Sequence, residues 1–312
     1  MRVWNGLDSV PDDLPPVACS IGKFDGVHLG HQEILRRVVD EARRLAAPAL
    51  LITFDPQPAV ILAPDRVPPL IQSRRQKLES LERSGLTDVV IVDFDGQLAA
   101  LDGEAFFTEL VLRRMKLRAL LVGSDFRFGQ GRKGDVAQAR RIGQREGFVV
   151  HQVPPVAVAG RTVSSSAIRE AVAAGDASLA WQMLGRPFAV SGEVVEGSGR
   201  ATEMQFPTAN LRVENELLPR RGVYVTETVA LAARHPSVTN VGVRPTFGGD
   251  QLIVETHLLD FEGDLYGERV EVRFLARVRD EMRFASAFEL ADQIARDRAA
   301  ALSYFQNLPL AT

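Results

Sequence analysis

The sequence has a single cysteine, Cys19, among its 312 residues, and this scarcity excludes several kinds of site. One cysteine cannot form an internal disulfide or a cysteine-based metal cluster, and it suits a small buried position in a reducing compartment. No apolar run approaches the roughly 18 residues of a membrane span, and the first residues lack the apolar core of a signal peptide. We therefore expect a cytoplasmic protein with no membrane partner.

An excess of charge of one sign is also lacking. The formal net charge is −3, from 37 basic and 40 acidic side chains, so the chain carries no general electrostatic footprint for nucleic acid. Any basic site must be local. The Walker pattern G-x-x-x-x-G-K-[ST] is absent as well, which argues against a P-loop mechanism.

The first part of the chain alternates short apolar runs with amphipathic stretches. Its length favours two domains, at roughly 100 to 200 residues each. The pattern predicts helices around residues 74–83, 104–115 and 136–146, and strands at Val17–Ile21, Ala49–Phe54, Val89–Phe94, Ala119–Gly123 and Phe148–Val153. Such alternation predicts an α/β fold with a parallel sheet covered on both faces.

From Pro187 the pattern changes to β-branched or alternating runs punctuated by glycine and proline. The runs at 188–195, 222–229, 252–259 and 270–275 predict an antiparallel sheet or barrel. The last stretch, 286–304, has apolar residues at helical spacing and should pack on this β domain. We place the domain boundary at residues 185/186.

Residues 22–31 read GKFDGVHLGH and place His28 and His31 where an apolar strand turns into an amphipathic helix. Backbone N–H groups and the dipole at a helix N-terminus favour phosphate, and side chains three apart share one helix face. A histidine there can add charge or donate hydrogen bonds to a departing pyrophosphate. We expect a nucleotide-phosphate site that includes Gly22, Phe24 and Gly26. The alternative is that the two histidines are half-buried structural residues whose imidazoles form hydrogen bonds with the backbone.

A polar and aromatic loop follows the predicted strand that ends at Gly123. In open α/β sheets ligands bind at the carboxyl ends of strands, so this loop should face the histidine turn. The aromatic side chains of this loop can stack on the planar ring of a ligand. The alternative is that they belong to the hydrophobic core and that the arginine beside them is solvated. The candidate cleft residues are Asp125, Phe126, Arg127 and Phe128.

Three serines, Ser164, Ser165 and Ser166, precede a helix-like run that ends near Gly175, with Arg169 one turn inside. Serine hydroxyls at such a position either cap the helix or bind phosphate. Three in a row followed by an arginine favour a phosphate role.

The second half carries a smaller set of candidates. Thr208 and Asn210 are two residues apart on an extended segment, so their side chains point to one side, and both offer oxygen ligands acceptable to Mg²⁺. Turn formation explains the same residues. Glu255 lies on a predicted strand, where its carboxylate either accepts a proton from a substrate hydroxyl or lies on a solvated face.

These motifs, in this order, resemble the bacterial bifunctional riboflavin kinase and FMN adenylyltransferase (FAD synthetase) family over nearly the whole chain. The His28–His31 tetrad HLGH is similar to the H-x-G-H motif of the wider nucleotidyltransferase superfamily. Segments TFDP at 53–56, GSDFRFG at 123–129 and SSSAIR at 164–169 are more specific for the flavin branch. FPTAN at 206–210 and VETH at 254–257 match riboflavin kinase motifs.

The resemblance implies a Rossmann-like nucleotidyltransferase domain at 1–185. In it, His28 and His31 would hold ATP phosphates, the 164–169 segment would contact the tail of ATP, and Asp125 with its neighbours would line the nucleotide and flavin cleft. The phosphate of FMN would attack the α-phosphorus of ATP, so no protein nucleophile is needed.

The resemblance also implies a small β-barrel riboflavin kinase domain with a terminal helix at 186–312. Thr208 and Asn210 would bind Mg–ATP, and Glu255 would deprotonate the ribityl 5′-hydroxyl. ATP phosphates would also contact Gly197, Gly199 and Arg200.

The chain departs from the family pattern near the second ATP site. Ala201 and Thr202 replace a Gly-Arg pair, and Gln205 replaces a glycine, so side chains there would either crowd the ATP phosphates or require another backbone path, and a positive charge is lost. In the first domain Gln57 replaces a histidine and Thr162 replaces an arginine.

Our main hypothesis is a cytoplasmic Mg²⁺-dependent enzyme, a monomer or weak homo-oligomer, that converts riboflavin to FMN and FMN to FAD with ATP. The small molecules riboflavin, FMN and ATP are then its partners, with no nucleic acid. The alternatives are a monofunctional FMN adenylyltransferase whose kinase domain is weak or inactive, and a regulatory flavin- or nucleotide-binding protein without catalysis.

Overall fold

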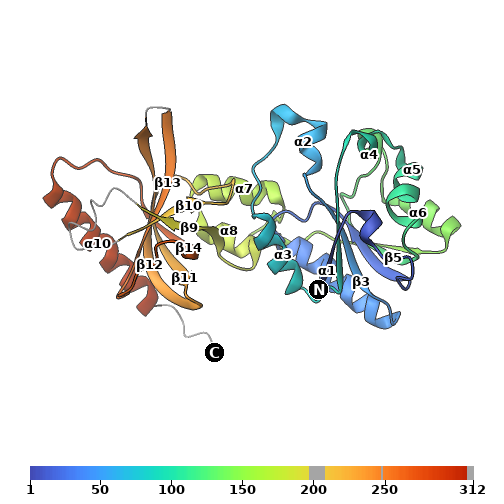
Figure 1. The fold of residues 1–312 in the computed structure, drawn as a ribbon, viewed down its shortest axis with the longest axis horizontal. Helices are drawn as coiled ribbons and strands as arrows, with labels where there is room; N and C mark the ends of the chain where they lie inside the picture. Colours follow the sequence, from blue (N-terminus) through green and yellow to red (C-terminus); the bar gives the residue numbers. More distant parts are fainter. Residues whose placement is uncertain (197–207, 247–248, 308–312) are drawn as a thin grey trace. The chain divides into compact units, whose positions relative to one another are not determined.

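The computed structural model describes residues 1–196, 208–246 and 249–307, which form two compact units (Figure 1). Unit 1 comprises Met1–Pro69 and Arg74–Ser164, and unit 2 comprises Leu70–Ser73 with the chain from Ser165 onward. Helices α7 (Ser165–Ala174) and α8 (Ala177–Leu184) belong to unit 2, where α8 packs against two strands of the barrel. The functional boundary at residues 185/186 stays a prediction.

Unit 1 is built on a six-stranded parallel sheet, as the sequence predicts. Helices cover both of its faces, which explains why the central strands are buried along their whole length (Figure 1). One face packs on α1 (Leu29–Arg44) and α3 (Arg74–Glu82), and the other on α5 (Gly103–Phe107) and α6 (Val136–Glu146). In spatial order the strands are β1 (Arg2–Asn5), β4 (Asp88–Val92), β3 (Ala49–Phe54), β2 (Val17–Ile21), β5 (Leu117–Gly123) and β6 (Val149–Val153).

Several features of unit 1 differ from the sequence prediction. The edge strand β1 was not predicted, because its four residues are mostly exposed and carry little apolar pattern. The helix predicted at 104–115 is interrupted, since α5 ends at Phe107 and a π-helical turn follows at Thr108–Leu112. The smaller elements are α2 (Pro58–Leu62), α4 (Gly96–Ala100) and the hairpin of β7 (Ala157–Val158) and β8 (Arg161–Thr162).

The strand order of the sheet reverses beside β2. Strands β3 and β4 continue the sheet on one side of β2, whereas β5 and β6 continue it on the other. In open α/β sheets ligands bind outside the carboxyl ends of the strands at such a switch point. The turn after β2 and the loop after β5 both begin at this point.

Unit 2 contains a closed antiparallel barrel, which confirms the barrel alternative for the second half. Its terminal helix α10 (Ala287–Gln306) packs on the barrel through Ala301, which lies against Val225 and Leu275. In spatial order the strands are β10 (Ala209–Val213), β13 (Gly249–Leu258), β12 (Ala233–Thr246), β11 (Gly222–Ala230), β14 (Arg269–Arg279) and β9 (Phe188–Val195). Strands β10 and β12 were not predicted; β12 contains Pro236 and Pro245, residues that argue against a central strand.

The interior of the barrel holds a buried chain of hydroxyl groups. Thr239 and Thr256 face each other across β12 and β13 and are joined by a 2.9 Å hydrogen bond, and Thr226 lies 2.7 Å from Thr239. All three are fully buried. Because successive side chains of a strand point to opposite faces, Glu255 next to Thr256 is directed to the outer face of the barrel.

Candidate active sites

The two histidines of the GKFDGVHLGH turn lie against each other at the start of α1. His28 is the N-cap residue, and its Nδ1 accepts a hydrogen bond of 3.3 Å from the backbone N–H of His31. The two rings are stacked with centroids 3.6 Å apart, and the Phe24 ring lies 4.6 Å from that of His31. The sequence prediction that both imidazoles lie at a helix N-terminus is confirmed.

The surroundings of His31 disfavour its charged form. Burial lowers its pKa well below the usual 6.5, and the neighbouring His28, Lys77 and Lys23 lower it further by charge repulsion. Its Nδ1 is buried and has no hydrogen-bond partner among the described residues. His31 is therefore neutral at pH 7, so of the two roles the sequence allows, hydrogen bonding fits and added positive charge does not.

The backbone of this turn adopts left-handed conformations at residues other than glycine. Gly26 has φ of 86°, which suits glycine, but Phe24 and Val27 have φ of 49° and 38°. Such a φ is unusual for a β-branched residue and costs on the order of 1–3 kcal/mol. Strained backbone of this kind concentrates at ligand sites, which supports a functional role for the turn.

Gly30 is required by the packing of the His28 ring. A methyl group at Gly30 would lie 3.2 Å from the Nδ1 and Cε1 atoms of His28 and 3.8 Å from the carbonyl oxygen of Val163. That ring cannot retreat freely because it already stacks on His31.

The Gly30→Ala variant should therefore form FAD from FMN about tenfold more slowly, since small displacements of aligned groups are costly in catalysis. Alanine favours the helix, so loss of α1 would not explain the defect. Gly96→Ala is a matched control, because a methyl group there meets nothing within 4 Å. Initial rates measured by chromatography check this; equal rates for both variants would contradict the role given to the His28 ring.

The carboxyl end of β5, where the loop begins, approaches the same helix. A methyl group at Gly123 would lie 2.9 Å from Oδ1 of Asp125 and 3.7 Å from Cδ1 of Ile34 on α1. Asp125 and Arg127 are exposed, whereas Phe128 is only 4% exposed and packs edge-on against Phe107 at 4.8 Å. This packing indicates that Phe128 is a core residue, which supports the loop from the interior of the unit.

Phe126 is partly buried against the same core and stacks on Phe128 with centroids 5.3 Å apart. Its carbonyl accepts a hydrogen bond of 2.8 Å from the side chain of Arg127. Phe126, Asp125 and Arg127 thus remain the cleft candidates at this strand end.

The structure divides the serine cluster between the two units. Ser164 ends unit 1, directly after Val163, whose carbonyl lies near Gly30. Ser165, Ser166 and Arg169 form the first turns of α7 in unit 2. Each unit therefore holds part of the predicted ATP-tail segment.

The family departures in unit 1 have identifiable positions. Gln57 is buried, and its side-chain amide donates a hydrogen bond of 2.9 Å to the carbonyl of Pro68, so it holds its own loop in place. Thr162 and Arg161 are exposed on the β7–β8 hairpin that precedes Val163.

Sequence reasoning missed one charged residue at the histidine turn. Lys77 on α3 is partly buried, and its ammonium donates hydrogen bonds of 2.7 Å to the carbonyl of Lys23 and to Oγ1 of Thr53. Nothing in the spacing of the 74–83 helix distinguishes this lysine from its neighbours. Only the fold brings it to the ends of β2 and β3.

On the barrel, Glu255 lies between two asparagines in adjacent strands. It pairs in register with Asn210 on β10 and with Asn240 on β12, so the three residues form a row across the outer face. The Asn210 amide lies 3.5 Å from the Thr208 carbonyl, to which it donates. The Thr208–Asn210 segment is thus brought beside Glu255, which is distant from it in sequence.

A second carboxylate lies beside this row. A methyl group at Gly242 would lie 2.6 Å from Oε1 of Glu281 and 3.0 Å from Nδ2 of Asn240. Sequence reasoning missed Glu281, since it follows the last strand and has no motif around it. Glycine at 242 keeps this outer face open.

The donor set on the barrel suits a weakly held hard cation. Among the residues that the structure describes, no three His, Cys, Asp or Glu side chains are grouped to hold a metal ion by themselves. Hydroxyl, amide and single carboxylate oxygens are ligands that Mg²⁺ accepts when nucleotide phosphates complete its shell. Gly197, Gly199, Arg200, Ala201, Thr202 and Gln205 lie outside the described residues.

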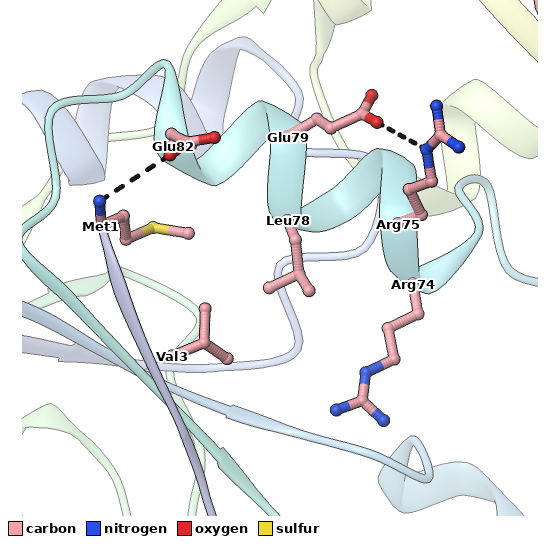
Figure 2. Close-up of a pocket in the computed structure, with 7 residues that line it drawn as sticks. All are labelled: Met1, Val3, Arg74, Arg75, Leu78, Glu79 and Glu82. Carbon is pink, nitrogen blue, oxygen red and sulfur yellow. Dashed lines mark hydrogen bonds and ion pairs between the residues drawn. The ribbon is translucent and has the colours of Figure 1, made fainter.

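A recess of about 450 Å³ lies elsewhere in unit 1, between β1 and α3 (Figure 2). Figure 2 shows an ion pair between the N-terminal amine of Met1 and Glu82 at 3.8 Å, and another between Arg75 and Glu79. No residue predicted for either site lines it; its walls are Met1, Val3, Arg74, Arg75, Leu78, Glu79 and Glu82.

Comparison with known proteins bears on both units. The FAD synthetase family model matches residues 10–167, and the riboflavin kinase family model matches residues 184–305. The bifunctional riboflavin kinase/FMN adenylyltransferase of Escherichia coli strain K12 is 38% identical over 308 residues, which cover 98% of each chain. Its counterpart in Pseudomonas fluorescens is 37% identical over 302 residues, covering 96% of this chain and 97% of that one.

The chain belongs to the bifunctional riboflavin kinase/FMN adenylyltransferase family. It combines an FAD synthetase domain with a riboflavin kinase domain, so it is both a nucleotidyltransferase and a kinase in the biosynthesis of FMN and FAD. Both activities use ATP, and such domains generally need a divalent metal.

A solved structure covers the whole chain as well. A chain from Streptococcus pneumoniae described as a macrolide-efflux protein superposes with a TM-score of 0.89 at 29% identity, over 99% of this chain and 100% of that one. The efflux description applies to the Streptococcus pneumoniae protein, and the similarity concerns the fold. None of the helices in the described part of this chain is long and apolar enough to cross a membrane.

Proposed function

We propose that the two units carry two separate active sites that act in sequence on the flavin. Riboflavin is phosphorylated to FMN on the outer face of the barrel, and FMN is adenylylated to FAD at the histidine turn, with release of pyrophosphate. The observation that carries this proposal is the separation of the groups: His28 and His31 lie in unit 1, and Glu255 lies in unit 2. We keep 1–185 and 186–312 as the functional domains.

At the barrel, Glu255 acts as the general base. Its carboxylate takes the proton of the ribityl 5′-hydroxyl while that oxygen attacks the γ-phosphorus of ATP. The register that places Asn210 and Asn240 on either side of Glu255 supports this role, because it gathers polar side chains around the carboxylate. Thr208 and Asn210 would hold Mg²⁺ with ATP, and the ion neutralises phosphate charge when bound.

At the histidine turn, catalysis consists of positioning and hydrogen bonding. The phosphate oxygen of FMN attacks the α-phosphorus of ATP, and His28 and the neutral His31 donate hydrogen bonds to phosphate oxygens. Gly22, Phe24 and Gly26 shape the turn around the phosphates. Ser164, Ser165, Ser166 and Arg169 bind the ATP tail, and Asp125 with its loop binds the nucleotide and flavin.

We also propose the partners, the metal, the compartment and the oligomeric state. We propose riboflavin, FMN and ATP as small-molecule partners, Mg²⁺ as the metal, and work in the cytoplasm as a monomer or weak homo-oligomer. Cys19 is free and fully buried, where burial raises its thiol pKa, so it fits a structural position in a reducing compartment.

Separate assays of the purified chain with riboflavin and with FMN, each with ATP and Mg²⁺, test this proposal. Chromatography should show FMN and FAD from the first mixture and FAD with pyrophosphate from the second. A chelator of divalent ions should stop both reactions, and Mg²⁺ should restore them. If FAD forms from FMN but no FMN forms from riboflavin, the chain is a monofunctional FMN adenylyltransferase. If neither mixture gives a product, the chain is a binding protein without catalysis.

A further inference from the structure

His31 itself carries no positive charge at the point where phosphate charge must be stabilised. Transfer of an adenylyl group leaves pyrophosphate with the bonding electron pair, so negative charge grows on its oxygens. His31 is neutral, because burial and nearby cations lower its pKa well below 6.5. A nearby cation must therefore supply the charge, and two lysines act on His31: Lys23 in the turn itself and Lys77 on α3.

Lys77 reaches this point from α3. Its ammonium has three N–H donors, and two of them bind the Lys23 carbonyl and Oγ1 of Thr53, each at 2.7 Å. Among the residues that the structure describes, no third acceptor is bonded to it. These partners lie at the carboxyl ends of β2 and β3, beside the strand-order reversal where ligands bind.

The ammonium of Lys77 lies beside largely buried polar groups. Thr53 is 1% exposed, and Asp25 in the turn is 5% exposed. The charge of Lys77 also reaches His31, whose protonation it opposes. A partly buried ammonium held by two hydrogen bonds is pre-oriented, which strengthens its attraction for phosphate.

We propose that Lys77 is a catalytic residue of FMN adenylylation, whose ammonium donates its third hydrogen bond to phosphate oxygens at the transfer centre. This inference rests on the proposed function of the histidine turn. The FMN phosphate oxygen forms a bond to the α-phosphorus of ATP, and the bond from that phosphorus to the bridging oxygen breaks. Pyrophosphate leaves with the electron pair, and Lys77 keeps its proton throughout.

The titration of Lys77 supplies a marker for this role. Burial lowers its pKa from 10.5 to about 8; Asp25 and Asp55 raise it, and Arg74 lowers it. Lys23, His28 and His31 are the other ionisable groups of the turn that belong to this cluster of charges. Because the cation is lost as pH rises through 8, kcat/KM for FMN adenylylation should fall above pH 8.

Three variants test the proposal in the full-length chain. Lys77→Met removes the charge, and FAD formation from FMN should fall about 100-fold to 1,000-fold, mostly in kcat. Lys77→Arg keeps a cation with a higher pKa, so it should recover at least a tenth of the activity and lose the fall above pH 8. Arg75→Met is the matched control on the same helix, since Arg75 is exposed and paired with Glu79 (Figure 2).

A purely structural brace between Lys23 and Thr53 would behave differently. Thr53→Val removes one acceptor but keeps the ammonium, and we expect less than a tenfold loss. Riboflavin phosphorylation by the same preparations is the internal control for folding and should stay within twofold of wild type. If Lys77→Met adenylylates FMN within threefold of wild type, or if Thr53→Val is equally damaging, the proposal is overturned. Absence of FAD formation by the unmodified chain would instead overturn the proposed function.

Discussion

Replacing Glu255 with glutamine should reduce riboflavin phosphorylation by about 100-fold to 10,000-fold, the range expected for loss of a general base. Glutamine has nearly the shape of glutamate but cannot accept the proton of the ribityl hydroxyl. The row of Asn210, Glu255 and Asn240 should persist, because backbone pairing of β10, β13 and β12 sets it. The measurement is the initial rate of FMN formation at saturating ATP.

The same variant should convert FMN to FAD at the wild-type rate, since the histidine turn lies in unit 1. Glu262→Gln is a suitable control, because it removes a carboxylate from the exposed loop after β13. An equal loss of both activities in Glu255→Gln would contradict two separate sites. Unchanged riboflavin phosphorylation would remove Glu255 from its role as base.

The opposite pattern is expected for His28→Ala. FAD formation from FMN should fall about 100-fold to 1,000-fold, equivalent to about 2.7–4 kcal/mol of transition-state stabilisation. The substitution removes the ring that stacks on His31 and the N-cap acceptor for the His31 N–H. Riboflavin phosphorylation should be unaffected, and both rates can be followed by chromatography of the flavins.

His28→Asn separates catalysis from helix capping, because asparagine is a good N-cap residue but lacks the ring. It should be as defective as the alanine variant in FAD formation while its thermal unfolding matches wild type. His151→Ala removes a half-exposed histidine from β6 in the same unit and should leave both activities intact. Wild-type adenylylation by His28→Asn would refute the role of the imidazole.

Sequence patterns predicted the elements that carry the sites better than the contacts within them. Strand β2 and helix α6 have the predicted bounds, since a buried run and an amphipathic period determine them locally. Gly22 and Gly26 were predicted to belong to a phosphate site at this turn. The left-handed φ of Val27 could not be predicted, because β-branched residues rarely adopt it.

Long-range pairing explains the other omissions. The position of Asn240 beside Glu255 depends on the register between β12 and β13. Strand β12 was not predicted because prolines within it argue against a central strand. Lys77 becomes part of the histidine turn only when α3 packs beside β2 and β3. Phe128 was left between a ligand-stacking and a core role, and only its burial against Phe107 favours the core.

Mixing two single-site variants tests the central claim, that one chain carries two independent active sites, most directly. Glu255→Gln and His28→Ala are each incubated with riboflavin, ATP and Mg²⁺, alone and as an equimolar mixture, and the flavins are separated by chromatography. We predict little FMN or FAD from the first alone, FMN with little FAD from the second alone, and FAD from the mixture. A mixture that forms no more FAD than the separate variants would contradict two sites joined by diffusing FMN.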